Sequence, residues 1–160
     1  LGTAGAMQEY TRVGDSVIAT GAVRQEGTSP QYMPMEFPAV SSHDMTSALE
    51  KAVKASEGKY HLGVVQSKDS FYGQHSPDKM PVSHELNQKW EAWVKGGVLC
   101  SEMEAATLFV VGSYRKLRTG ALLIIAGDQN REESLTKEEY LDAVSKSTNI
   151  ILEASLDIPT

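Results

Sequence analysis

The sequence predicts an α/β fold, with helices layered against a β-sheet, on the basis of three observations. Apolar segments of strand length lie at residues 15–23, 60–67 and 120–127. Segments with helical periodicity alternate with these strands along the chain. The length of 160 residues is typical of one domain with a substantial core. We therefore expect residues 1–160 to form a single layered domain.

The strands are predicted from residue type and from neighbouring turns. "DSVIATGAV" (15–23) is rich in β-formers, and "YHLGVVQS" (60–67) has the pattern of a short buried strand. "GALLIIAG" (120–127) is apolar throughout, which is typical of a strand covered on both faces. The opening "LGTAG" has the pattern of a strand end that enters a tight glycine turn. With no strand before it, this pattern predicts that a substantial N-terminal part is missing.

The helices are predicted from their terminal residues. Segments 41–58 and 83–97 each begin with serine, a preferred N-cap, and end with glycine. The last helix begins with Thr136 and Glu139, which have the spacing of a capping box.

Composition excludes several classes of protein. The net charge is −6 and no cluster of Lys or Arg is present, so we expect no nucleic-acid partner. The single cysteine, Cys100, fits a reducing compartment. No apolar run has the roughly 20 residues that a membrane span requires. The first residues also lack the pattern of a signal peptide. A cytoplasmic protein without a membrane partner is expected.

The stretch "LCSEMEAATLF" (99–109) places two carboxylates, Glu102 and Glu104, in an otherwise apolar or small-residue run. Desolvating an unpaired carboxylate costs several kcal/mol or more. One interpretation is a capping box of Ser101 and Glu104, with both acids in the first turn of a helix. The other is that a polar ligand meets them. Spacing alone leaves both open.

Further polar residues follow predicted strands, where open α/β sheets bind ligands. Thr3 lies in the glycine-rich opening, which is either an anion-binding turn or a plain turn. Phe71 and Gln74 in "SKDSFYGQH" suit a planar heterocycle, although an aromatic near a loop is more often core. Asp128 follows the apolar strand. The histidines lack metal-site spacing and no catalytic triad pattern is present, so metal and covalent mechanisms are disfavoured.

Five motifs together resemble the nucleoside phosphorylase family, and most closely its uridine phosphorylases. They are "GTAG", "EGTSPQYMPMEFPAV", "KDSFYGQHSPDKMPV", "SEMEAATLF" and "GDQNR". The likeness covers nearly the whole chain, and the pair "FYGQH" and "SEMEA" is highly specific. The resemblance implies a layered α/β/α fold with a mixed central sheet. It also implies that this chain is the C-terminal portion of the catalytic domain, without the preceding glycine loop and the arginines for phosphate.

For the sugar and phosphate, the resemblance implies three site residues. Glu104 would accept hydrogen bonds from the ribose 2′- and 3′-hydroxyls, and Met103 would pack against the sugar. Thr3 would touch both phosphate and sugar.

For the base, the resemblance implies that Glu102 lies beside the pocket, Phe71 covers the ribose or base, and Gln74 recognises O2 and N3–H of a pyrimidine. Many uridine enzymes carry an arginine soon after this glutamine; Lys79 is the nearest basic residue here, and a point charge replaces a planar fork. At the position of Asp128, the resemblance implies an Asn in uridine-acting enzymes and an Asp in purine-acting relatives.

The implied reaction is reversible phosphorolysis of uridine to uracil and ribose 1-phosphate, with inorganic phosphate as co-substrate and no cofactor. A purine nucleoside phosphorylase and a hydrolytic nucleosidase of the same fold are the nearest alternatives. An inactive structural module is the alternative from another class. The resemblance also implies a dimer-based homo-oligomer, up to a hexamer.

Overall fold

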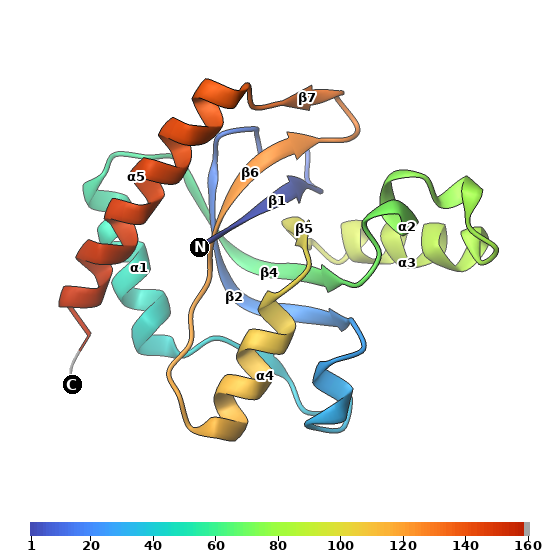
Figure 1. The fold of residues 1–160 in the computed structure, drawn as a ribbon, viewed down its shortest axis with the longest axis horizontal. Coiled ribbons are helices and arrows are strands. Elements are labelled where there is room, and N and C mark those ends of the chain that lie inside the picture. The colour runs from blue at the N-terminus through green and yellow to red at the C-terminus, as the bar shows by residue number, and fades with distance from the viewer. Residues whose placement is uncertain (159–160) are drawn as a thin grey trace.

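The computed structural model describes residues 1–158, which form a mixed β-sheet flanked by helices (Figure 1). The strands are β1 (Gly2–Ala6), β2 (Ser16–Gln25), β3 (Ala39–Val40), β4 (Tyr60–Lys68), β5 (Cys100–Glu102), β6 (Leu122–Asp128) and β7 (Glu133–Ser134). The helices are α1 (His43–Ala55), α2 (Phe71–His75), α3 (Ser83–Lys95), α4 (Ala105–Arg115) and α5 (Lys137–Leu156), with short 3₁₀ turns η1 (Ser29–Gln31) and η2 (Pro77–Lys79).

Five strands close into a barrel. The sheet order is β3-β2-β4-β5-β1-β6-β7, and β2 also pairs with β6. The ring therefore runs β2-β4-β5-β1-β6 and back to β2. Within it, β2–β4, β4–β5 and β1–β6 are parallel, whereas β1–β5 and β2–β6 are antiparallel. The predicted α/β fold with a mixed central sheet is confirmed.

Strand β1 corrects the prediction of a glycine turn at the start of the chain. Gly2–Ala6 is extended and lies between β5 and β6, with Thr3 opposite Ile124 and Gly5 opposite Ser101. Gly2 serves close packing rather than a turn, since a Cβ at this position would lie 3.1 Å from Leu123 Cδ2. Ala4 and Ala6 are buried on the inner side, where larger side chains would crowd a small barrel.

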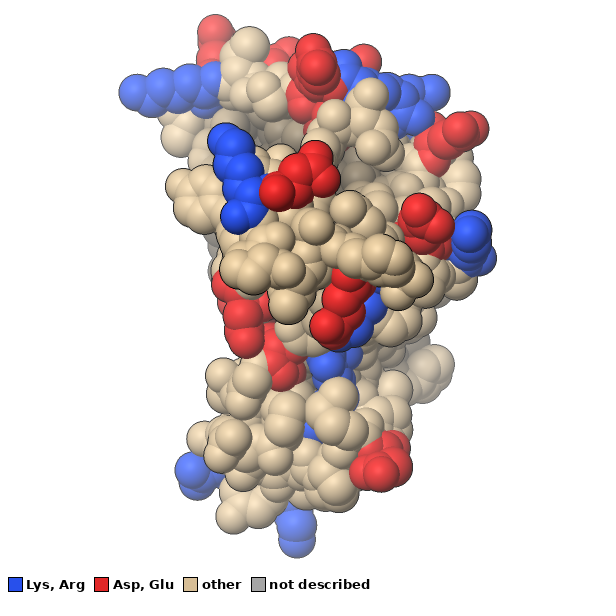
Figure 2. Space-filling model, turned by 90° about the vertical axis from the view of Figure 1, so that its right-hand side faces the viewer, with Lys and Arg blue, Asp and Glu red and all other residues tan. Residues whose placement is uncertain are grey.

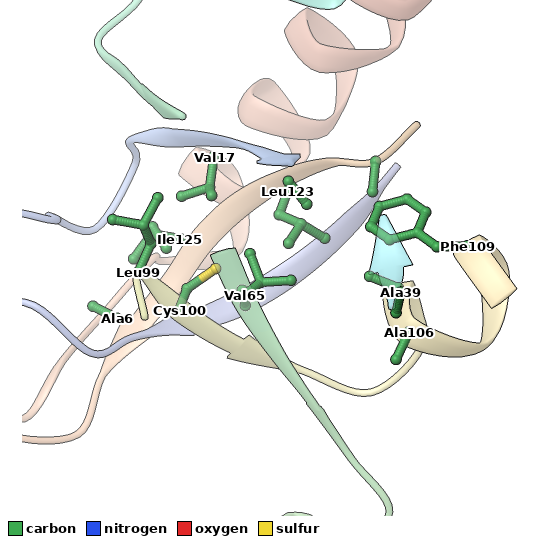
Figure 3. Packing of buried hydrophobic residues seen from close by; sticks show 14 of the residues in the cluster. Ala6, Val17, Ala39, Val65, Leu99, Cys100, Ala106, Phe109, Leu123 and Ile125 are labelled. Atoms are coloured by element: carbon green, nitrogen blue, oxygen red, sulfur yellow. The ribbon is translucent and has the colours of Figure 1, made fainter. Parts of the chain in front are cut away.

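Two groups of buried side chains surround the barrel. One includes Val65, Cys100, Phe109 and Leu123 and joins the strands to α4 (Figure 3). The other, which includes Ile18, lies under α1 and α5, which pack side by side. The thiol of Cys100 is fully buried, and this burial raises its pKa. Its role is packing, because a buried thiol is a poor nucleophile.

Helices α2 and α3 project from the barrel on the side opposite α1 and α5 (Figure 1). Seen from that side, acidic and basic side chains are interspersed over the surface (Figure 2). Of the helices in residues 1–158, none has an apolar stretch of the length that a bilayer requires.

The element predictions hold to different degrees. Residues 122–125 are buried in β6, and the capping box of Thr136 and Glu139 begins α5, so both predictions are confirmed. The strand at 60–67 is buried only from Val65 onward. Ser83 is the first residue of α3 rather than its cap, which is Val82.

Candidate functional site

The described residues include two prominent cavities. The larger, about 1200 Å³, lies between α1, α5 and the turn before β2, and it contains none of the residues predicted for a site. The other, about 700 Å³, lies over β1. It is lined by the last residues of β4, β5 and β6, by α2 and by the segment before α4. Seven of the eight predicted site residues line it: Thr3, Phe71, Gln74, Glu102, Met103, Glu104 and Asp128. We take this smaller cavity as the candidate site.

Glu102 is a buried carboxylate with a full set of donors. It is 3% exposed at the end of β5. One oxygen accepts from the Ser67 hydroxyl, and the other accepts from the backbone N–H groups of Glu104 (2.7 Å) and Ala105 (2.8 Å). Burial raises the pKa of Glu102, and the nearby charge of Glu104 adds to this effect, while the three hydrogen bonds oppose it.

These contacts correct the predicted capping box of Ser101 and Glu104. Ser101 belongs to β5, and α4 begins only at Ala105. Glu104 occupies the N-cap position without a side-chain capping bond. The start of α4 is instead capped by Glu102, reaching forward from the strand, and by Ser67, whose Oγ accepts from Ala106 N–H at 2.8 Å.

Glu104 and Met103 extend into the cavity. Both are exposed, and within residues 1–158 the Glu104 carboxylate accepts no hydrogen bond from another residue. Its neighbour Glu102 already satisfies the N–H groups that a first-turn carboxylate would otherwise serve. The oxygens of Glu104 are therefore available to an external donor, and the apolar Met103 side chain lies beside them.

Lys68 and Ser101 are site residues that sequence reasoning missed. Lys68 is only 7% exposed, and its Nζ donates to Ser101 Oγ at 2.5 Å. Ser101 Oγ in turn donates to Gln74 Oε1 at 2.6 Å. Burial lowers the pKa of Lys68, and the charges of Glu102, Cys100 and Glu104 partly offset this effect. The available signal was a lysine directly after the segment predicted to be a buried strand, residues 60–67.

Phe71 and Gln74 lie on the short helix α2, which is capped by Ser70 through the N–H of Gly73 (2.9 Å). The Phe71 ring is half exposed at the cavity and stacks on His75, with ring centroids 4.0 Å apart. Burial lowers the pKa of His75, and the charge of Lys68 lowers it further. This edge of the cavity therefore presents flat, mostly uncharged surfaces beside one amide.

Asp128 lies buried at the end of β6 with both oxygens occupied. Oδ1 accepts from the N–H groups of Asn130 (2.9 Å) and Arg131 (3.3 Å), and Oδ2 pairs with the Arg131 guanidinium. Arg131 also donates to the carbonyl of Glu9 at 2.6 Å. Asp128 thus holds the turn between β6 and β7.

The structure does not bring Lys79 to the cavity. It lies on η2, exposed, and is absent from the cavity lining, whereas Thr3 lies on β1 and lines it. The expected replacement of the family arginine by Lys79 is therefore unsupported by this arrangement. Within the described part of the chain, no group of three or more acidic, His or Cys side chains is placed to hold a metal ion.

Comparison with known proteins adds to this geometry. Residues 1–157 match the phosphorylase superfamily. The chain belongs to this superfamily. It is 48% identical to a uridine phosphorylase of Treponema pallidum and 34% identical to one of Escherichia coli, over 96% and 97% of the chain. A guanosine phosphorylase of Halorubrum lacusprofundi is 34% identical over 96% of the chain. The chain spans about 60% of the length of the curated relatives it matches.

We predict that Glu102 stabilises the fold through its acceptor oxygens rather than through its charge. Glu102→Ala would leave two backbone N–H groups without acceptors and should lower the free energy of unfolding by about 2–4 kcal/mol. Glu102→Gln keeps a carbonyl oxygen for both and should cost less than about 1 kcal/mol. Chemical denaturation measures both, with the exposed Glu91→Ala on α3 as the control.

The same pair of variants has a predicted pH dependence. The pKa of Glu102 is raised above its ordinary value of 4.5, so the folded wild-type protein binds a proton at this carboxyl more tightly than the unfolded chain does. Its stability should therefore fall relative to Glu102→Gln as pH rises from about 4.5 through the folded-state pKa. If the difference in the free energy of unfolding between the wild type and Glu102→Gln stays constant between pH 4 and 8, the raised pKa of Glu102 is contradicted.

Proposed function

We propose that the cavity over β1 binds a nucleoside and that the full natural protein catalyses reversible phosphorolysis of uridine. The observation that carries this proposal is the exposed carboxylate of Glu104, which accepts no hydrogen bond from any side chain or N–H group of residues 1–158 and shares one cavity with Phe71 and the Gln74 amide. Superfamily membership and identity to uridine phosphorylases support it.

The sugar is proposed to lie against Glu104 and Met103. A carboxylate with two free oxygens suits a vicinal diol, because each hydroxyl can donate one charge-assisted hydrogen bond. Met103 supplies an adaptable apolar surface for the ring carbons. Thr3, on the adjacent strand β1, offers a hydroxyl toward the sugar and phosphate.

The reaction needs positioning and electrostatics more than a covalent protein nucleophile. A phosphate oxygen forms a bond to C1′ of the ribose while the bond from C1′ to N1 of uracil breaks. The bonding electron pair leaves with the base, which then takes up a proton, and positive charge develops transiently on the sugar. In this proposal, the Glu104 carboxylate stabilises that charge through the hydrogen bonds that it accepts from the ribose hydroxyls.

Phosphate requires cationic partners beyond this cavity. Of the described residues that line it, Lys68 is the one Lys or Arg. We propose that the remaining cations come from groups outside these 160 residues, including a second subunit of a dimer-based homo-oligomer.

A pyrimidine is the preferred base in this proposal, and a purine is the second candidate. The guanosine phosphorylase relative and the presence of Asp128 favour a purine. However, both Asp128 oxygens accept hydrogen bonds from N–H donors, so neither is free to donate a proton to a purine nitrogen. Gln74, in contrast, offers donor and acceptor side by side in the cavity.

The first prediction is that uridine cleavage by the full natural protein requires inorganic phosphate and yields ribose 1-phosphate. Product analysis with and without phosphate measures this. Cleavage at an equal rate without phosphate would indicate a hydrolytic nucleosidase. No cleavage under either condition would indicate a module without catalysis.

The second prediction is that Glu104→Ala discriminates between ribose and deoxyribose substrates. Loss of two charge-assisted hydrogen bonds should reduce kcat/KM for uridine by the equivalent of roughly 2–5 kcal/mol. Turnover of 2′-deoxyuridine should suffer much less, because one hydroxyl is already absent. Stability should change little, since Glu104 has no partner to lose, and equal damage to both substrates would contradict the assignment.

The third prediction concerns the base. The protein should prefer uridine over inosine by kcat/KM, and Gln74→Ala should remove most of that preference, since mismatched ligands leave buried polar groups unpaired. Asp128→Asn should reduce stability by loosening the contact with Arg131 without changing the preference. If inosine is the better substrate and Asp128→Asn abolishes its cleavage, the purine assignment is correct.

A further inference from the structure

Glu26 is a second buried carboxylate that contacts α4, and it takes no part in the proposed reaction. It follows β2 directly and is 6% exposed. Three donors converge on one of its oxygens, Oε2: the N–H groups of Thr28 (2.7 Å) and Ser29 (2.8 Å) and the hydroxyl of Thr107 (2.8 Å). Burial disfavours the charge of Glu26, but these hydrogen bonds outweigh burial and hold its pKa below the ordinary value. Glu26 is therefore ionised at neutral pH.

The other oxygen of Glu26 has no partner. Within residues 1–158, Oε1 is buried and accepts no hydrogen bond. A buried charged acceptor without a donor carries a substantial cost in free energy. A shorter side chain such as Asn or Ser can satisfy the N–H groups of a turn without a buried charge. What distinguishes Glu26 from such a turn residue is its bond to Thr107, 81 positions along the chain.

Thr107 connects this carboxylate to the candidate site. It lies in the first turn of α4, three residues after Glu104, which occupies the N-cap position. Residues at this spacing lie on the same side of a helix. Neither Glu26 nor Thr107 lines the cavity, whereas Glu104 does. The bond from Thr107 to Glu26 therefore fixes the side of the helix start from which Glu104 extends.

The first turn of α4 is held from two directions. Glu102 and Ser67, from β5 and β4, accept hydrogen bonds from the backbone N–H groups at the start of this helix. Glu26, from the end of β2, holds the side chain of Thr107. Loss of the Thr107 bond leaves the first set of bonds intact. The helix start then still forms, but its first turn can shift relative to β2.

The turn that carries Glu26 is well supported as an anchor. The N–H of Gly27 donates to the carboxylate of Asp69, which lies between β4 and α2, at 2.9 Å. The guanidinium of Arg24 donates to Ser29 Oγ at 2.9 Å and to backbone carbonyls of the loop that follows. Such support matters, because a shift of about 1 Å in a substrate-binding group can cost roughly a hundredfold in rate.

We propose that Glu26, acting through Thr107, is a positioning residue that holds the Glu104 carboxylate where it accepts from both ribose hydroxyls. This inference rests on the proposed nucleoside function. A correctly oriented carboxylate gains two charge-assisted hydrogen bonds from a vicinal diol, and a displaced one keeps at most one. A 2′-deoxynucleoside donates only one such bond, so displacement of Glu104 affects it much less. Glu26 thereby sets the preference for ribonucleosides.

The test compares the full natural protein with Thr107→Val, Thr107→Ser and Glu26→Ala, each measured with uridine and 2′-deoxyuridine. Thr107→Val keeps the shape but removes the hydroxyl, and it should lower kcat/KM about tenfold for uridine and less than about threefold for 2′-deoxyuridine. Glu26→Ala removes the acceptor and should show the same pattern. Thr107→Ser keeps the donor and should retain uridine cleavage within about threefold. Thr148→Val is the matched control, since the Thr148 hydroxyl donates to the Val144 carbonyl within α5.

A second background separates positioning from general damage. In Glu104→Ala no carboxylate remains to be positioned, so adding Thr107→Val should change uridine cleavage by less than about twofold. A structural defect would instead lower the cleavage of both nucleosides in both backgrounds, which would overturn the proposal. Equal losses for uridine and 2′-deoxyuridine in the single variant Thr107→Val would also overturn it. This variant decides the question if Glu26→Ala does not fold.

Failure of the inference is distinguishable from failure of the proposed function. A wild-type protein without phosphate-dependent uridine cleavage overturns the proposed function and the role of Glu26 with it. An active wild-type protein in which Glu104→Ala loses the preference for uridine over 2′-deoxyuridine, while Thr107→Val keeps it, overturns the role of Glu26 alone.

Discussion

The antiparallel pairing of β2 with β6 is the constraint on which the rest of the structure depends. It places Ser16 opposite Ile124 and Ile18 opposite Leu122, and it converts an open sheet into a closed ring. Closure forces β1 between β5 and β6 and brings the last residues of β4, β5 and β6 around one cavity. It also limits the interior to small side chains on β1, because a five-stranded barrel is narrow.

Closure explains why the N-terminal segment was mispredicted. Gly2 and Gly5 lie in a sequence typical of a turn, and no local signal shows that β1 is surrounded by two neighbours. Only the packing does so, through the close approach of Leu123 to Gly2. In contrast, β6 was predictable, because residues 122–125 are apolar on both faces and are buried on both faces. Thr136 and Glu139 were predictable because a capping box is a local structure.

The residues of the candidate site also fall into those that the sequence could indicate and those that only the structure reveals. The motif residues Phe71, Gln74 and Glu104 line the cavity, as a position-by-position likeness to known proteins can indicate. Lys68 could not be found in this way, because its relevance depends on the register between β4 and β5, which sets Ser67 opposite Glu102 and Gln66 opposite Ser101. Lys79 does not line the cavity, because proximity in sequence to the Gln74 motif does not by itself bring a side chain there.

Two carboxylates one residue apart, Glu102 and Glu104, have opposite environments. Glu102 ends a buried strand, so its charge is met by Ser67 and by the N–H groups that open α4. Those bonds complete the helix start, and Glu104 therefore has no structural donor to bind. Lys68 lies within electrostatic range of both acids and offsets part of their negative charge. Because Glu102 binds the N–H groups at the start of α4, the carboxylate of Glu104 is left free for a ligand. Loss of the Glu102 side chain would therefore also disturb the position of Glu104.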